Sequence, residues 1–138
     1  MPYVDIRIGG PCLPETIDRF ATRMTGLVAE ILRKKHELTA VAVHCVPPGH
    51  WYVAGKSLSA QGLATFFLEV NVTEGTNTRD EKAAFVAAAF AAAEGILGRL
   101  DAASYVIVRD VAADAWGYQG RTQEQRRIGN SLSGGKAS

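Results

Sequence analysis

Apolar and polar residues alternate in four short segments of the chain, and this period of two predicts four β-strands. In the first segment, Val4, Ile6 and Ile8 alternate with polar or amphipathic neighbours. The other three predicted strands are rich in β-branched and aromatic residues and cover residues 39–46, 65–72 and 105–111. Residues 50–55 predict a short hairpin or extended excursion between the second and third strands.

Two further segments show the helical period of about 3.6 residues. A helix is expected to begin near Pro14, and one apolar stripe runs along it: Ile17, Phe20, Ala21, Met24, Leu27, Val28, Ile31 and Leu32. A second helix is expected from residue 79 to about 97, because Thr78 and Glu81 have the spacing of a capping box. Its expected buried stripe is Phe85, Ala89, Ala92 and Ile96.

The order strand, helix, strand occurs twice, which indicates an internal repeat. Residues 5–8 precede the similar residues 69–72 by 64 positions, whereas Trp51 precedes Trp116 by 65, so one inserted residue reconciles the two halves. We therefore expect a single α+β domain over residues 1–121, made of two fused β-α-β units at about 2–60 and 65–121. These units would form a four-stranded sheet with two helices on one face. The other face would be partly apolar and would need an oligomeric partner. The ordered pattern is expected to end near Gly120, leaving residues 122–138 as a polar C-terminal tail with a flexible end.

Composition narrows the range of partners. The net charge is only +1, and no apolar run is long enough to span a bilayer, so neither nucleic acid nor a membrane is an expected partner. Cys12 and Cys45 are the only cysteines. No secretory signal precedes the first strand, so we expect a cytoplasmic protein with two free, buried thiols.

Pro2 is the candidate for chemistry. A small residue after Met1 permits removal of the initiator methionine, and the chain would then begin with a secondary amine on a core strand. Burial in an apolar pocket lowers the pKa of such an amine toward neutrality. A base of that kind suits general acid–base catalysis.

These features together resemble the tautomerase superfamily, which includes 4-oxalocrotonate tautomerase. The marks are Met1-Pro2 on a strand, the fused repeat, Glu74-Gly75 before a polar helix start, and the aromatic-glycine segment at residues 114–120. The resemblance implies a homotrimer that acts without a metal or organic cofactor on a small carboxylate substrate. It also implies that Pro2 is the general base of a keto–enol tautomerase acting on a 2-oxo acid.

The resemblance suggests further residues that bind the substrate. In the family, arginines bind the substrate carboxylates, and one of them commonly follows the Glu-Gly of the strand–helix loop. Here Thr76 occupies that position, and Arg79 follows three residues later at the start of a helix, so Arg79 is the first candidate. His36 resembles the substrate-binding histidine turn of cis-3-chloroacrylic acid dehalogenase. Trp116 and Tyr118 would wall the pocket. Two strand residues are weaker candidates: Arg7 is expected to reach a neighbouring unit's pocket or to pair with Glu69, and Arg109 to lie in a subunit interface.

Two alternatives remain open at this stage. A protonated Pro2 would instead support a hydratase or dehalogenase of an unsaturated acid. In the family, the dehalogenases and malonate semialdehyde decarboxylase carry paired arginines close to the strand–helix loop, and this sequence lacks them. The chain could also be a non-catalytic β-α-β ligand-binding or assembly module. Retention of Met1 would favour that last alternative, because a blocked proline nitrogen cannot act as a base.

Overall fold

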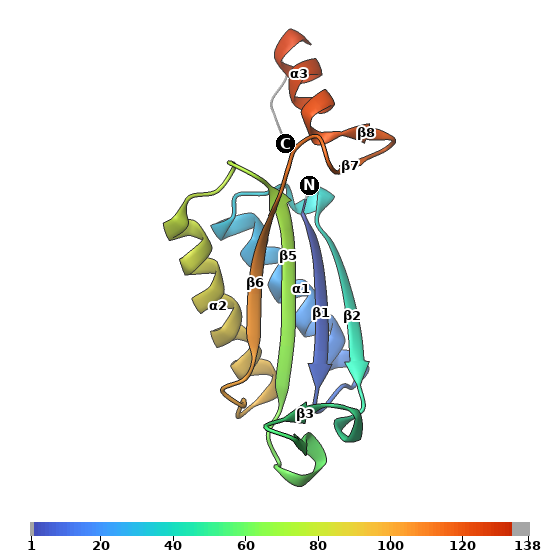
Figure 1. Ribbon diagram of the computed structural model, residues 1–138, viewed down its shortest axis with the longest axis vertical. Coiled ribbons are helices and arrows are strands. Elements are labelled where there is room, and N and C mark those ends of the chain that lie inside the picture. The colour runs from blue at the N-terminus through green and yellow to red at the C-terminus, as the bar shows by residue number, and fades with distance from the viewer. Residues whose placement is uncertain (1, 134–138) are drawn as a thin grey trace.

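A computed structural model of the chain describes residues 2–133. Its centre is a four-stranded sheet in the order β2-β1-β5-β6. The outer pairs, β1 with β2 and β5 with β6, are parallel, and the central pair of β1 with β5 is antiparallel. The strands are β1 (Tyr3–Gly9), β2 (Ala40–Val46), β5 (Thr65–Thr73) and β6 (Tyr105–Val111). Helices α1 (Pro14–Ile31) and α2 (Arg79–Leu97) both lie against one face of this sheet (Figure 1). The predicted pair of fused β-α-β units is confirmed.

The core lies between the sheet and the two helices. Val4, Ile6 and Ile8 of β1 are fully buried, and four residues of β5 continue the layer: Phe66, Leu68, Val70 and Val72. The stripe on α1 that covers them includes Phe20, Met24 and Val28. On α2 the buried residues are Phe85, Ala89, Ala93 and Leu97, whereas Ala92 and Ile96 of the expected stripe are only partly buried. The small side chains of α2 allow the two helices to pack closely on the sheet.

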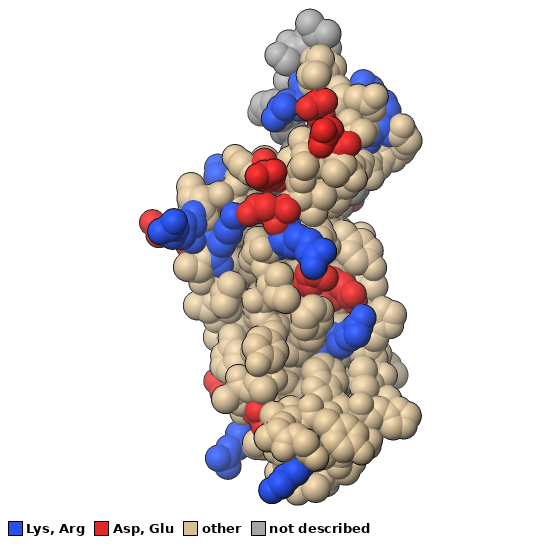
Figure 2. All heavy atoms as spheres, in the orientation of Figure 1, with Lys and Arg blue, Asp and Glu red and all other residues tan. Residues whose placement is uncertain are grey.

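No helix among residues 2–133 covers the opposite face of the sheet, and we call it the open face. It carries large apolar side chains: Tyr105 is 61% exposed, Tyr3 is 43% exposed and Ile107 is 40% exposed. Charged side chains of both signs lie next to one another across the middle of this face, and the surface between them and the β3–β4 end of the molecule is mostly uncharged (Figure 2). Exposed apolar area of this kind is typical of a surface that packs against another subunit.

Two short hairpins lie at opposite ends of the sheet. The first pairs β3 (Tyr52–Val53) with β4 (Lys56–Ser57), and the second pairs β7 (Gly117–Tyr118) with β8 (Arg121–Thr122). The second hairpin leads into a helix, α3 (Gln123–Ser133), which projects beyond the end of the sheet where β1 begins (Figure 1). Short 3-10 helices complete the chain: η1 (His36–Leu38), η2 (Pro48–His50) and η3 (Leu58–Ala60).

The helix α3 corrects the prediction that the ordered pattern ends near Gly120. Its start is capped reciprocally, because the Gln125 amide donates to Thr122 Oγ1 at 3.0 Å and the Thr122 amide donates to Gln125 Oε1 at 2.9 Å. A threonine followed three residues later by glutamine is a capping-box signal, so the sequence did carry a mark of this helix. Part of the expected flexible end, residues 134–138, lies outside the described residues.

The two cysteines form a disulfide, so the expectation of free thiols was wrong. Cys12 lies in the loop after β1 and Cys45 lies in β2, and their Cα atoms are 6.1 Å apart. The parallel pairing of β1 and β2 places Cys45 opposite Ile8, close to that loop. A spacing of 33 residues in the sequence gives no hint of this proximity. The cysteines therefore do not support the prediction of a reducing compartment.

Within residues 2–133, no helix is both long enough and apolar enough to span a membrane.

Candidate functional site

Three of the predicted site residues meet at one end of the sheet, which we call the Pro2 end. Strands β1 and β2 begin at this end, and β5 and β6 finish there, because β1 and β5 are antiparallel. Pro2 directly precedes β1, and His36 lies in η1 just before β2. Arg79 opens α2 a few residues after β5 ends. The hairpin β7–β8 also lies beyond this end (Figure 1).

Pro2 is buried and continues the hydrogen-bond ladder of β1. Its carbonyl accepts a hydrogen bond from the Ala40 amide at 3.3 Å. Because side chains alternate along a strand, Pro2 belongs to the same face as the buried Val4, the face that the helices cover. Extending the strand pairing by one residue places Pro2 in one row with Thr39, Val72 and Asp110. Asp110 is two strands away in that row, about 10 Å from Pro2. Met1, whose removal the sequence predicts, lies outside the described residues.

His36 and Arg79 are both exposed at the Pro2 end. The His36 carbonyl accepts a hydrogen bond from the Thr39 amide at 3.2 Å, which fixes the turn into β2. Arg79 is the first residue of α2. Both side chains are therefore free to turn toward a molecule bound at this end.

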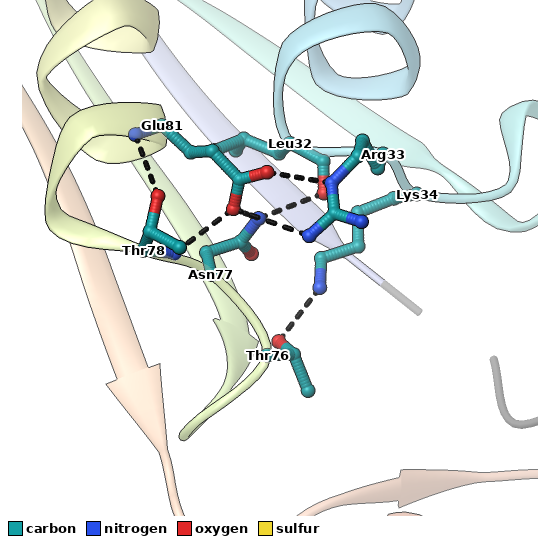
Figure 3. Close-up of polar contacts among 7 residues, drawn as sticks. All are labelled: Leu32, Arg33, Lys34, Thr76, Asn77, Thr78 and Glu81. Carbon is teal, nitrogen blue, oxygen red and sulfur yellow. Dashed lines mark hydrogen bonds and ion pairs between the residues drawn. The ribbon is translucent and has the colours of Figure 1, made fainter.

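A polar cluster joins the end of α1 to the start of α2 (Figure 3). Thr78 and Glu81 form the predicted capping box, with the Glu81 amide donating to Thr78 Oγ1 at 3.1 Å and the Thr78 amide donating to Glu81 Oε1 at 2.9 Å. Arg33 donates to Glu81 Oε2 at 2.6 Å through Nε. Asn77 donates through Nδ2 to the Leu32 carbonyl at 2.9 Å, and so caps the end of α1. The predicted capping box is confirmed, and its Glu81 also binds Arg33 from the segment that follows α1.

These contacts shift the pKa values of Glu81 and Arg33. The hydrogen bond from Arg33, followed by that from the Thr78 amide, lowers the pKa of Glu81 from its ordinary value of 4.5 to about 2. The same hydrogen bond raises the pKa of Arg33. Both groups therefore remain charged over the whole physiological range of pH.

Lys34 lies beside this cluster and was not predicted from the sequence. Its Nζ donates to Thr76 Oγ1 at 2.7 Å, which connects the segment between α1 and η1 to the loop between β5 and α2 (Figure 3). Burial, and next the positive charge of Arg33, lower the pKa of Lys34. In the sequence it stands within the basic run 33–35, and no local signal separates it from its exposed neighbours.

The predicted aromatic residues Trp116 and Tyr118 lie in or next to the second hairpin, and Arg126 of α3 covers part of the Tyr118 surface. The Arg126 guanidinium from α3 lies over the Tyr118 ring, 3.7 Å from its centroid, and donates to the Tyr118 carbonyl at 2.9 Å. Trp116 is half-buried, and its carbonyl accepts a hydrogen bond from the Gln123 amide at 2.9 Å. Tyr118 therefore packs against its own chain on one ring face, and only its other surface remains for a ligand.

Arg7 does not join the other predicted residues. It lies five residues along β1 from Pro2, about 17 Å away at the rise of a strand, and it faces the open side of the sheet. There its guanidinium lies 6.0 Å from the centroid of the Phe67 ring. It also lines a cavity of about 460 Å³ with seven other residues, and Pro2 is not among them: Asp5, Val46, His50, Trp51, Tyr52, Phe67 and Glu69. Within one chain, Arg7 and Pro2 cannot bind the same small molecule.

Glu69 pairs with Arg109 rather than with Arg7, since Arg109 Nε lies 2.7 Å from Glu69 Oε1. The predicted pairing of Arg7 with Glu69 is therefore replaced by a pair between the neighbouring strands β5 and β6. Among residues 2–133, no group of three or more His, Cys, Asp or Glu side chains is placed to hold a metal ion.

Comparison with known proteins matches both halves of the chain. The family model described as tautomerase enzyme matches residues 2–61 and again residues 67–126. A fused 4-OT that forms a wild-type symmetric trimer has a similar structure, with a TM-score of 0.76 and 19% identity over 87% of this chain and 94% of that one. Pt0534, solved after inactivation by 2-oxo-3-pentynoate, has a TM-score of 0.76 and 21% identity over 87% and 94% of the two chains.

A macrophage migration inhibitory factor-like protein from Entamoeba histolytica is also similar in structure, with a TM-score of 0.73 and 16% identity over 88% of this chain and 97% of that one. No curated protein matches the sequence. At these identities, the structural neighbours support the fold, and the double match to the family model shows the family.

Proposed function

Because the chain belongs to the tautomerase family, we propose that it is a cofactor-independent keto–enol tautomerase of a 2-oxo acid, with Pro2 as the general base. The observation that carries the proposal is the position of Pro2. It is buried at the start of a central strand, and cationic side chains from both helices gather at the same end of the sheet.

The proposed reaction moves one proton and changes no oxidation state. After removal of Met1, the neutral nitrogen of Pro2 accepts the proton of the enol hydroxyl, and the oxygen becomes the ketone. The protonated nitrogen then returns the proton to the carbon next to the new carbonyl, which completes the new C–H bond. Burial of Pro2 favours this chemistry because an apolar surrounding disfavours the charged form of the amine, and a general base must be neutral.

The substrate would be held by positive charge at the Pro2 end. Arg79 offers an exposed guanidinium at a helix start, where backbone amides also attract an anion. His36 stands on the other side of Pro2, before β2. Trp116 and the remaining surface of Tyr118 would form the apolar wall. Together these residues would form a small site for a carboxylate that carries an unsaturated carbon chain.

We further propose a homotrimer. A fused 4-OT of similar fold forms a symmetric trimer, and the apolar side chains of the open face here need a partner. In such an assembly Arg7, which is too far from the Pro2 of its own chain, would be available to a neighbouring chain.

The proposal is tested by following the ketonisation of phenylenolpyruvate and 2-hydroxymuconate in the ultraviolet. Pro2→Ala is expected to lower kcat/KM by about 10²-fold or more, because a positioned general base contributes that much. Pro11→Ala, which changes an exposed proline at the other end of β1, is the matched control and should retain activity. Intact mass must show that Met1 is absent from each protein.

The pH dependence distinguishes the proposal from its alternative. A general base requires kcat/KM to rise as pH increases through the ionisation of Pro2. A hydratase or dehalogenase that uses protonated Pro2 would show the opposite slope with an unsaturated or halogenated acid. If the processed wild type shows no ketonisation of either enol, the proposed activity is wrong.

A further inference from the structure

We propose that the cavity around Arg7 on the open face, here called the Arg7 cavity, binds a small zwitterion, namely an α-amino acid with an apolar side chain. The ligand carboxylate would pair with Arg7 and the ligand ammonium group with Asp5. The ligand side chain would lie against Trp51 and Tyr52. The Arg7 cavity lies toward the β3–β4 end of the sheet and does not include Pro2, so this binding is separate from the proposed tautomerase activity.

Two rows of side chains on the central strands form the floor of the Arg7 cavity. The antiparallel pairing of β1 with β5 places Arg7 opposite Phe67 and Asp5 opposite Glu69. Side chains alternate along a strand, so these four lie on the face opposite to the buried residues of both strands. A positive and a negative group are therefore two residues apart on one strand, with about 7 Å between their Cα atoms.

Arg7 and Asp5 both lack a close partner of opposite charge among residues 2–133. Arg7 forms no ion pair in this part of the chain. Asp5 Oδ1 is buried and accepts no hydrogen bond there, and His44 Nε2 lies 3.9 Å from it, beyond hydrogen-bonding distance. Glu69, in contrast, is compensated by Arg109, whose Nε lies 2.7 Å from Glu69 Oε1. The floor therefore presents one positive and one negative group that are free to pair with a ligand.

These two charges determine the class of ligand. A simple carboxylate would pair with Arg7 but would meet the like charge of Asp5, and a simple amine would meet the reverse situation. A zwitterion pairs with both groups and leaves the net charge of the cavity unchanged. The Asp5 side chain is only 24% exposed, so water screens a contact with it less than a contact on an open surface.

The segment that leads into the first hairpin forms an aromatic wall. Trp51 is half-buried and Tyr52 is 63% exposed. Trp51 packs directly on β1 at Gly9, where an added Cβ atom would lie 2.8 Å from Trp51 Cε3. The Trp51 carbonyl also accepts a hydrogen bond from the Leu58 amide at 2.9 Å. The wall is therefore fixed to the sheet, and its apolar surface suits the side chain of the ligand.

The size of the Arg7 cavity fits such a ligand. Its volume of about 460 Å³ lies within the range of about 300–1,000 Å³ that is usual for small-molecule sites. One chain supplies both charged groups and the aromatic wall, so the site does not depend on a second copy of the chain.

Calorimetric titration of the full chain with L-phenylalanine tests the proposal, together with two analogues that carry one charge each. The analogue 3-phenylpropanoate lacks the ammonium group, and 2-phenylethylamine lacks the carboxylate. Titration of each analogue in the presence of L-phenylalanine measures only its competition for the same site. Each analogue is expected to have a Kd about tenfold or more above that of L-phenylalanine, because one hydrogen bond between charged groups is lost.

Three variants locate the site. Arg7→Met should raise the Kd of L-phenylalanine by about tenfold or more. Asp5→Asn should raise it by a similar factor but should not weaken the binding of 3-phenylpropanoate, because that analogue has no ammonium group. Arg79→Met is the control at the Pro2 end, and it should bind L-phenylalanine as the wild type does.

Four results would overturn the proposal. The first is a wild type that does not bind L-phenylalanine, and the second is an equal Kd for L-phenylalanine and 3-phenylpropanoate. The third is an equal loss of both ligands in Asp5→Asn, because a merely structural defect affects both. The fourth is binding that Arg79→Met loses and Arg7→Met retains, which would place the ligand at the Pro2 end. No measurement here requires turnover, so the amino-acid site and the tautomerase activity can fail independently.

Discussion

At the scale of single residues, Glu81 links the two halves of the repeat. Its carboxylate accepts hydrogen bonds from Arg33, from Asn77 and from the Thr78 amide. The two oxygens of the Glu81 carboxylate therefore cap α2 and bind Arg33, which lies two residues beyond the end of α1. The Glu81 side chain is 22% exposed and that of Arg33 is 65% exposed, so solvent screens their ion pair in part.

The lowered pKa of Glu81 predicts a pH-dependent contribution to stability. Its folded-state pKa of about 2 lies below the ordinary value of 4.5, so the contribution is complete above about pH 5 and is lost as pH falls toward 2. Urea unfolding at pH 6 and pH 2.5 should therefore show Glu81→Gln less stable than wild type at the higher pH, with a clearly smaller difference at the lower one. Glu94→Gln, on the exposed side of the same helix, is the control and should show no such convergence. A difference that is constant with pH would contradict the prediction.

At the scale of elements, the hairpin β7–β8 and α3 behave as one unit that packs on itself. The turn needs glycine at position 117, because a Cβ atom there would collide with the Arg121 backbone. Arg126 then fastens α3 to the hairpin through the Tyr118 ring and carbonyl. The unit projects from the sheet at the Pro2 end, so its internal contacts determine how firmly Trp116 and Tyr118 are held (Figure 1).

Arg126→Met should loosen this unit without unfolding the sheet. The variant loses a stacked cation and its hydrogen bonds to Tyr118, and together these contribute about 1–2 kcal/mol to local stability. Amide hydrogen exchange should accelerate in residues 117–129 and remain unchanged in β1 and β5. Arg127→Met changes the exposed neighbouring arginine and should leave exchange unaltered. Unchanged exchange in both variants would show that Arg126 does not hold the unit together.

At the scale of the whole molecule, the open face of the sheet is the reason to expect that the chain forms an oligomer. Tyr3, Tyr105 and Ile107 lie on one surface that no helix of residues 2–133 covers. Between neighbouring strands of this surface, Glu69 forms an ion pair with Arg109, and Asp5 Oδ1 lies 3.9 Å from His44 Nε2. Burying such a face against two copies of the chain removes apolar area from water. The charged residues would then be held at defined positions within the interface.

The proposed trimer predicts that a charge on the open face shifts the oligomeric state. Ile107→Asp should produce monomers or dimers in light scattering coupled to size-exclusion chromatography, because a carboxylate in an apolar interface must give up its water. Val86→Asp introduces the same charge at a residue of similar exposure on the outer side of α2, and it should remain trimeric. A wild-type protein that is monomeric at micromolar concentration would refute the trimer directly.

The sequence by itself determined the elements and their order. The period of two in the strands, the stripe on α1 and the Thr78 capping box are local properties, and each was found in the structure where the residues predicted it. The double β-α-β pattern was sufficient to predict the four-stranded sheet with both helices on one face. The Thr122–Gln125 capping signal of α3 was also present, although the polar composition around it led to the prediction of a tail.

Only the tertiary structure decided which distant residues meet. The antiparallel pairing of β1 with β5 brings Pro2, His36 and Arg79 to one end and leaves Arg7 on another part of the sheet. The parallel pairing of β1 with β2 joins Cys12 to Cys45, and the approach of the two helices gives Lys34 its contact with Thr76. These contacts depend on strand order, register and helix packing, which arise from the burial of the whole core, whereas a local pattern records only the preferences of neighbouring residues.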